Sequence, residues 1–282
     1  MNEPRVYKNS PFLFGLLFVM FAVLLFAFFF AARDNDFSNP IVMVLFALVF
    51  GLLFMFLVFS ATSQTSISDD EISTKNLLGT KSLRWSEISR VSGRGYAIKL
   101  HNFDEDVKVA PSPQLPGYEE VVNWIGVKRP DLFSPLEYAE MSRSWTGTIL
   151  FSLAGLFLLA GLGFFVLTQA GDILIPFLVF VVLGAVSVVS VFTTPQAIAI
   201  QGNSIVIGYL FNQKTFSANE IASVDLRYTQ TRNGKNYFIT LALGNRKTIR
   251  ISGLRPSLPV VFLVLKNWHR ENTAIGLTNQ QN

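Results

Sequence analysis

Four long apolar runs without a single charged residue constrain this chain more than any other feature of its sequence. They cover residues 12–32, 41–59, 146–168 and 173–192. A helix rises about 1.5 Å per residue, so about 20 apolar residues cross the roughly 30 Å hydrocarbon core of a bilayer. The composition agrees, since 50% of the 282 residues are hydrophobic and only 15% are charged. We therefore expect four transmembrane helices, because the rest of the chain is too short to cover four such helices in a core.

The segments around these runs predict their topology. Residues 33–40 and 169–172 are short and contain turn-forming residues, so each pair of runs is expected to form a hairpin that returns the chain to its starting side. Basic residues near the ends of the runs, such as Lys8 and Arg143, lie on the side that holds both termini. The positive-inside rule makes that side cytoplasmic. The expected location is the cell membrane, as a multi-pass protein with both β-rich regions in the cytoplasm.

The sequence also contains an internal duplication. Glu87-Ile88 matches Glu220-Ile221 at an offset of 133, and Asn123-Trp124 matches Asn267-Trp268 at an offset of 144. Most of the increase falls after Val91, which predicts a longer hairpin around residues 229–235 of the second copy. The predicted organisation is an N-terminal tail (1–11), a transmembrane hairpin (12–60), a first β domain (61–142), a second hairpin (143–192) and a second β domain (193–282).

Each β domain is predicted to consist of short strands followed by one helix. The turn signals Gln201-Gly202-Asn203 and Asn233-Gly234 separate apolar runs of strand length. Apolar residues at helical spacing predict helices at about 117–127 and 257–271. In the second copy, strands are expected at 197–200, 204–211, 214–216, 221–228, 237–243 and 248–251.

This arrangement resembles the bacterial pleckstrin-homology-like (PH-like) membrane protein family. The local sequences at Trp85–Val91 and Phe216–Val224, where a polar stretch ends in Glu-Ile followed by Val, are similar to a recurrent strand pattern of that family. The resemblance implies a fold of four transmembrane helices in two hairpins, each followed by a PH-like antiparallel β barrel or sandwich that one C-terminal helix caps. It also implies an inner-membrane interaction module without catalytic residues. The chain departs from phosphoinositide-binding domains at Gln201-Gly202-Asn203, where their basic motif is absent.

Several classes of chemistry are excluded by what the sequence lacks. The absence of cysteine excludes disulfides, thiolate metal sites and cysteine nucleophiles. The only histidines, His101 and His269, lie in different copies, and the acidic groups 69–71 and 104–106 lack the spacing of a calcium loop. No phosphate-binding loop, dinucleotide fingerprint or Ser–His–Asp set is present. We therefore expect no enzymatic activity, no cofactor and no metal site, and the absence of nucleic-acid-binding motifs argues against a nucleic-acid partner.

The basic second domain is the main candidate for a binding surface. Residues 193–282 hold 10 basic and 3 acidic residues, a net charge of +7, whereas residues 61–142 hold 9 and 12, a net charge of −3. Strand alternation turns Arg227 and Arg250 outward if their apolar neighbours face the core. The candidate residues for binding a partner or lipid are Arg227, Arg232, Lys235, Arg246, Lys247, Arg250 and Arg255.

Three functions remain open from the sequence alone. The first is a membrane-anchored, non-enzymatic scaffold that presents two PH-like domains to a protein partner or to a second copy of itself. The second is a sensor that binds anionic lipid headgroups through the basic face of 193–282, since each basic residue near an anionic leaflet contributes about 1 kcal/mol. The third is an accessory subunit of a transport or export system, although the apolar runs contain no ionisable group to line a pathway.

Overall fold

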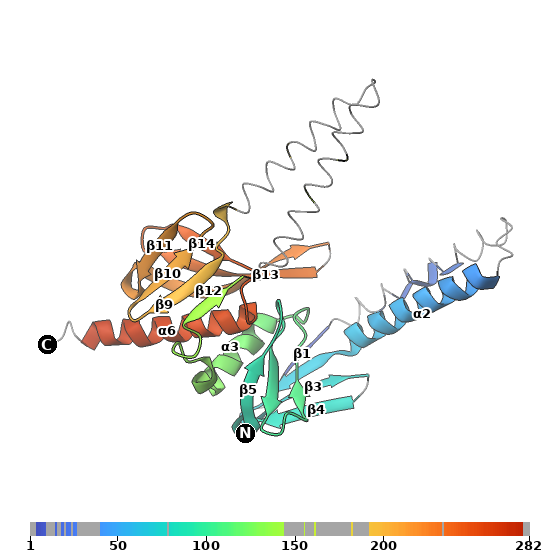
Figure 1. Cartoon of the computed structure of the whole chain (residues 1–282). Coiled ribbons are helices and arrows are strands. Elements are labelled where there is room, and N and C mark those ends of the chain that lie inside the picture. The colour runs from blue at the N-terminus through green and yellow to red at the C-terminus, as the bar shows by residue number, and fades with distance from the viewer. Residues whose placement is uncertain are drawn as a thin grey trace, which may run out of the picture. The chain divides into compact units, whose positions relative to one another are not determined.

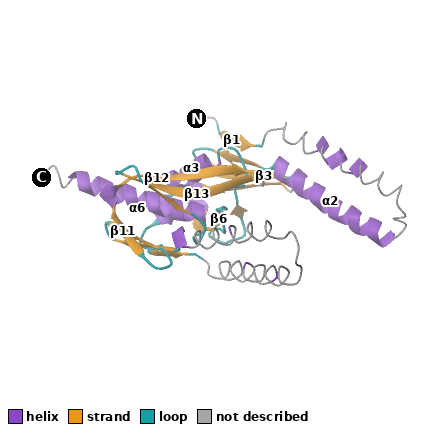
Figure 2. Ribbon diagram, turned by 90° about the horizontal axis from the view of Figure 1, so that it is seen from above, coloured by secondary structure: helices purple, strands orange, loops and turns teal. Residues whose placement is uncertain are grey.

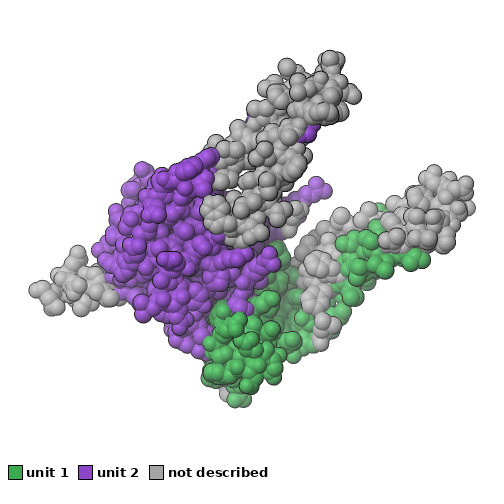
Figure 3. Space-filling model, viewed as in Figure 1, with its two compact units in different colours: residues 1–91, 99–128 green, residues 92–98, 129–282 purple. Residues whose placement is uncertain are grey.

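A computed structural model describes residues 4–9, 40–77, 79–143, 192–232 and 234–278, together with isolated residues between 15 and 26 and at 155, 161 and 182. The chain divides into two compact units (Figure 3). Unit 1 comprises Met1–Val91 and Lys99–Lys128, and unit 2 comprises Ser92–Ile98 and Arg129–Asn282.

Unit 1 contains two antiparallel sheets and a helix that follows them (Figure 1). The four-stranded sheet has the order β1-β2-β3-β4, with β1 at Arg5–Lys8, β2 at Gln64–Ile67, β3 at Glu71–Asn76 and β4 at Gly79–Arg84. The three-stranded sheet has the order β5-β6-β7, with β5 at Ile88–Ser92, β6 at Lys99–Asn102 and β7 at Lys108–Val109. The helical elements are α2 at Pro40–Thr62, the single 3₁₀ turn η1 at Trp85–Glu87 and α3 at Tyr118–Lys128.

Strand alternation and the apolar stripe of α3 build the core of unit 1. Ile72 and Leu83 lie opposite each other on β3 and β4, and both are buried. Helix α3 buries Val121, Val122 and Ile125 completely, because these residues share one helical face. The first strand is tied to α3, since Tyr7 Oη donates a hydrogen bond to Glu120 Oε2 at 3.1 Å.

Unit 2 repeats the order of elements found in unit 1. Its four-stranded sheet has the order β11-β10-β9-β8, with β8 at Glu140–Ser142, β9 at Ala197–Gln201, β10 at Ser204–Gly208 and β11 at Gln213–Ser217. Its three-stranded sheet has the order β12-β13-β14, with β12 at Ile221–Thr231, β13 at Gly234–Leu243 and β14 at Thr248–Ile251. The helical elements are η2 at Pro130–Phe133, η3 at Ala218–Glu220 and α6 at Leu258–Thr278.

Helix α6 is the central element of the unit 2 core, and it lies beside β12 in Figure 2. Every residue from Leu258 to Leu265 is buried, so this half of the helix is covered on all sides rather than along one stripe. The segment Ser92–Ile98 contributes to that cover, because the Leu258 N–H donates to the Gly95 carbonyl oxygen at 2.8 Å. Trp268, one turn further along, is 1% exposed.

The predicted fold class of four transmembrane helices in two hairpins is corrected by this structure. Among the helices that the described residues form, none combines the length and the apolar character that crossing a membrane requires. The multi-pass inner-membrane description, and the membrane location with cytoplasmic β domains, depended on that fold class and are corrected with it. The run 41–59 lies within α2, whereas most of 12–32 and nearly all of 146–168 and 173–192 fall outside the described residues. The physical reason is that an apolar run shows only that a segment avoids water, and does not specify what covers it.

Two features of the units differ from the boundaries expected from the sequence. The segment predicted to be an N-terminal tail, 1–11, contains β1, which pairs with β2 across more than 50 intervening residues. Strand β8, within the predicted first domain 61–142, pairs with β9 and lies in unit 2. Each unit therefore completes its four-stranded sheet with a strand that precedes a pair of apolar runs in the sequence.

Candidate functional site

The seven predicted basic residues do not form one cluster on unit 2. Arg227 and Arg250 lie on the outer face of the three-stranded sheet, on β12 and β14. Arg232 and Lys235 lie at one end of the β12–β13 hairpin, and Arg246 and Lys247 lie in the β13–β14 turn at the other end of the sheet. The two turns are separated by the length of β13, about 30 Å at 3.3 Å per residue. The seven residues therefore cannot bind one small ligand together.

The outer face of the three-stranded sheet brings two predicted arginines together. Arg227 on β12 lies directly opposite Phe238 on β13, and Arg250 on β14 lies opposite Thr240. The Arg250 Cζ atom is 3.7 Å from the centroid of the Phe238 ring, so the two side chains are stacked. We call Arg227, Phe238, Thr240 and Arg250 the arginine face.

The sequence places these side chains outward because the alternate residues of the same strands are apolar. Val224 and Leu226 on β12 are 6% and 8% exposed, and Ile239 and Leu241 on β13 are fully buried. A strand turns successive side chains to opposite faces, so Arg227 must face outward when its neighbour Leu226 faces the core. The predicted orientation of Arg227 and Arg250 agrees with their exposure.

Stacking prepares the arginine face for an anionic group. A guanidinium that lies against a ring keeps its edge of N–H donors open, and that edge matches the two oxygens of a carboxylate. Arg227 is only weakly engaged, because its Nη2 atom is 3.5 Å from Asp225 Oδ2 and its side chain is 63% exposed. Thr240 lies between Asp225 and Arg250 in the sheet and is 8% exposed, and its hydroxyl is buried with no hydrogen-bond partner among the described residues. The face therefore combines two cations and an aromatic ring with one carboxylate, that of Asp225, which lies opposite Thr240.

The extended hairpin presents a second group of side chains on the opposite face of its strands. Lys235 Nζ lies 4.3 Å from the centroid of the Tyr228 ring, and the Tyr228 and Tyr237 rings are 5.6 Å apart. Tyr96 packs on Tyr237 with ring centroids 5.9 Å apart. Because β14 pairs only with Ile239–Ala242, the outer part of this hairpin is a two-stranded ribbon, and such ribbons need side-chain packing to be stable.

The remaining predicted residues have local structural settings. Arg246 adopts a φ of 65° in the β13–β14 turn, where the Leu243 N–H donates to the Lys247 carbonyl oxygen at 2.8 Å. The Arg255 backbone N–H donates to the Ser142 carbonyl oxygen at 3.0 Å, which links β8 to the segment after β14. Arg232, Arg246 and Lys247 have exposed side chains.

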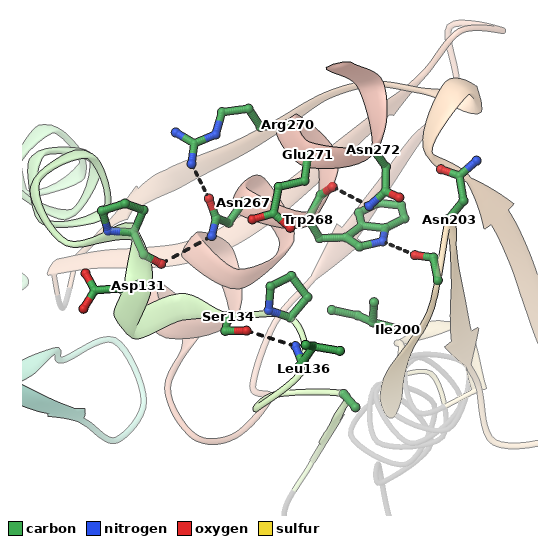
Figure 4. Close-up of a pocket in the computed structure, with 14 residues that line it drawn as sticks. Asp131, Ser134, Leu136, Ile200, Asn203, Asn267, Trp268, Arg270, Glu271 and Asn272 are labelled. Atoms are coloured by element: carbon green, nitrogen blue, oxygen red, sulfur yellow. Dashed lines mark hydrogen bonds between the residues drawn. The ribbon is translucent and has the colours of Figure 1, made fainter. Parts of the chain in front are cut away.

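Unit 2 also contains a groove of about 800 Å³ that the sequence analysis did not identify (Figure 4). It lies between the second half of α6, the loop around Ser134 and the β9–β10 turn. Trp268 Nε1 donates to the Gly202 carbonyl oxygen at 2.8 Å, and Asn267 Nδ2 donates to the Pro130 carbonyl oxygen at 3.3 Å. In the sequence, the repeated Asn-Trp pair indicates the duplication, but it does not by itself indicate a groove.

The charges along this groove are mostly engaged with the protein itself. Arg129 donates to both carboxylate oxygens of Asp131, and this hydrogen bonding lowers the pKa of Asp131 below its ordinary value. Arg270 Nη2 donates to Asn267 Oδ1 at 2.5 Å, as Figure 4 shows. The groove thus carries side chains of both charges. It does not favour a ligand of one charge as the arginine face does.

Phe238 and Thr240 were not among the residues predicted from the sequence. Strand alternation could have placed both on the outer face, because they alternate with the buried residues Tyr237, Ile239 and Leu241. Their contact with Arg250 depends on the register of β13 and β14, which the sequence pattern alone did not specify. Within the described ranges, no three His, Cys, Asp or Glu side chains are grouped closely enough to hold a metal ion.

Comparisons with known proteins add no functional assignment. No protein-family model matches the chain, and a search of curated proteins gave no match.

Proposed function

We propose that this chain is a non-enzymatic interaction protein whose two PH-like β units bind a protein partner. The order of elements in each unit supports this proposal, since a four-stranded sheet, a three-stranded sheet and a helix follow one another in both. Unit 2 would make the contact, because it carries the basic surface.

The observation that carries the proposal is the geometry of the arginine face. Arg250 is held against Phe238 at 3.7 Å, and Arg227 lies across from the same ring. Arginine and aromatic residues contribute most to binding at protein interfaces, and a preorganised side chain loses less entropy on binding. A partner segment with carboxylates and apolar side chains would match this face.

Site-specific photo-crosslinking of the full-length chain in the cells that naturally express it tests the proposal. A photoreactive residue at Thr229 lies on the outer face of β12, two residues from Arg227. We expect a defined protein adduct that decreases at least about tenfold in the variant Arg227→Glu/Arg250→Glu, because close interfacial charge pairs couple by about 1.5 kcal/mol or more. The matched control is Arg246→Glu/Lys247→Glu, which changes the net charge equally at the end of the same sheet and should keep the adduct.

Two results would contradict the proposal. The first is the absence of any protein adduct, and the second is an equal loss in the control variant, which would show a general charge effect. The lipid alternative is tested by co-sedimentation of the purified full-length chain with phosphatidylglycerol vesicles and with phosphatidylcholine vesicles. Binding to the anionic vesicles that depends on Arg227 and Arg250 would replace the protein partner with a lipid surface.

A further inference from the structure

The β6–β7 turn of unit 1 has the chemistry that the arginine face would bind. Phe103 is 73% exposed, and it is followed by three acidic residues, Asp104, Glu105 and Asp106. Glu105 is paired with Arg90 at 2.5 Å, and one oxygen of Asp106 accepts a hydrogen bond from Asn102 Nδ2 at 2.5 Å. Asp104 and the second oxygen of Asp106 have no hydrogen-bond partner among the described residues, and both residues lie on an exposed turn.

The equivalent turn of unit 2 has the opposite charge. Glu105 and Arg246 are the two non-glycine residues with positive φ in the described part of the chain, at 56° and 65°. Their backbone N–H groups donate to Asn102 and Leu243 at corresponding places in the two turns, at 3.2 Å and 3.0 Å. The duplication thus kept the turn geometry while its charge changed sign, so the fold does not require the acidic charge of the β6–β7 turn.

We propose that the occupant of the arginine face is the turn Phe103–Asp106 of a second copy of this chain. This inference rests on the proposed function and names its partner. Phe103 packs against Phe238, while the carboxylates of Asp104 and Asp106 bind Arg227 and Arg250.

The spacing of the groups permits this arrangement. Arg227 and Arg250 lie two strands apart and are offset by two residues along the sheet, so their backbones are about 12 Å apart at 4.8 Å per strand and 3.3 Å per residue. The Arg250 guanidinium lies over the ring of Phe238, the residue opposite Arg227, so it is closer to Arg227 than the Arg250 backbone is. Two carboxylates at alternate positions of a tight turn lie within a similar range. The charges are complementary, because residues 61–142 carry a net −3 and residues 193–282 a net +7.

Energy transfer between labelled full-length copies tests the contact directly. The chain has no cysteine, so Lys99→Cys in a donor copy and Thr229→Cys in an acceptor copy each give a single labelling site. We expect transfer that rises with concentration and weakens with salt, since the contact depends on exposed charges. Asp104→Lys/Asp106→Lys in the donor copy should raise the dissociation constant about tenfold or more.

A charge swap separates the contact from general effects. Combining Asp104→Lys/Asp106→Lys in the donor with Arg227→Glu/Arg250→Glu in the acceptor should restore transfer, which also shows that both variants are folded. The matched control, Asp70→Lys/Glu137→Lys in the donor, reverses two exposed acidic residues elsewhere and should leave transfer unchanged.

The inference is overturned if transfer does not depend on concentration, or if the control weakens it as much as the turn variant does. These failures differ from failure of the proposed function. If Thr229 crosslinks to another protein in an arginine-dependent manner while labelled copies show no transfer, the protein-binding function stands and the second copy is the wrong partner. If Thr229 captures no protein at all, including a second copy, both proposals fall.

Discussion

The duplication supplies a matched pair of tryptophans whose surroundings predict very different responses to the same substitution. Trp268 in α6 is 1% exposed, and its Nε1 atom donates to the Gly202 carbonyl oxygen at 2.8 Å. Replacing Trp268 with Phe removes this hydrogen bond, which contributes about 1 kcal/mol net. The smaller ring also leaves a cavity in a fully packed site, which costs about 1–2 kcal/mol. Gly202 is exposed, so its carbonyl can bond to water and adds no further penalty. We expect a total loss of about 2–3 kcal/mol.

The equivalent residue of unit 1, Trp124, serves as the control. It is partly exposed, and its ring contacts Arg5 and Lys128, whose charged groups lie 5.1 Å and 5.8 Å from the ring centroid. Cation–π contacts at exposed sites contribute about 0.5–1 kcal/mol, and Phe retains part of this. Trp124→Phe should therefore cost less than about 1 kcal/mol.

Hydrogen exchange measured by mass spectrometry on the full chain reports each unit separately. Trp268→Phe should accelerate exchange of the most protected unit 2 amides about 30- to 150-fold, since about 1.4 kcal/mol is a factor of ten. Trp124→Phe should accelerate those of unit 1 by less than about fivefold. Equal effects, or a larger effect at Trp124, would refute the argument from burial and hydrogen bonding.

Three further predictions concern unit 1, with Gly202 of unit 2 as a comparison, and use the same exchange measurement. Gly117→Ala should lower the stability by about 2 kcal/mol or more, because φ is 74° and an added Cβ would lie 2.8 Å from the Tyr7 ring. Gly202→Ala, with φ of 56° and nothing within 4 Å, should lower it by only about 1 kcal/mol. A larger loss for Gly202→Ala than for Gly117→Ala would contradict this prediction. Unit 1 should lose stability as the pH falls below about 6.5. Burial, with Lys108 as a further cause, lowers the pKa of His101, so the native state binds fewer protons than the unfolded state in this range. His101→Phe should flatten the dependence of unit 1 stability on pH. Thr65→Val should stabilise unit 1 by about 1 kcal/mol, because Thr65 is 1% exposed and its hydroxyl has no partner among the described residues; a loss of stability would show that the hydroxyl is engaged.

The regular strands and helices of unit 2 could be predicted from the sequence because their signals are local. The segment 221–228 alternates apolar and polar residues, and the structure has β12 over Ile221–Thr231. The segment 257–271 has apolar residues at helical spacing, and α6 begins at Leu258. The extra residues around 229–235 lengthen the β12–β13 hairpin, so the change of offset in the repeat had a direct structural meaning.

The rest depends on contacts between distant segments. Strand β1 has only four residues and no apolar alternation, and it becomes a strand because it pairs with β2. The segment Ser92–Ile98 follows unit 1 residues in the chain but belongs to unit 2, where Gly95 accepts a hydrogen bond from Leu258. The partners of Arg250 depend on sheet register, which is a property of two strands together. Such pairings carry no signal within a short window of sequence.

The two copies share their inward-facing residues and differ at their outer surfaces, and this division indicates where function lies. Ile88 and Ile221 occupy equivalent buried positions after the single turns η1 and η3, so selection on folding accounts for their similarity. The β6–β7 and β13–β14 turns keep one backbone conformation at Glu105 and Arg246, yet folding does not require the charge at an exposed turn to be acidic in one copy and basic in the other. An acidic turn that the scaffold does not require is best explained by what that turn binds. The arginine face and the acidic turn are therefore the features on which the first experiments should focus.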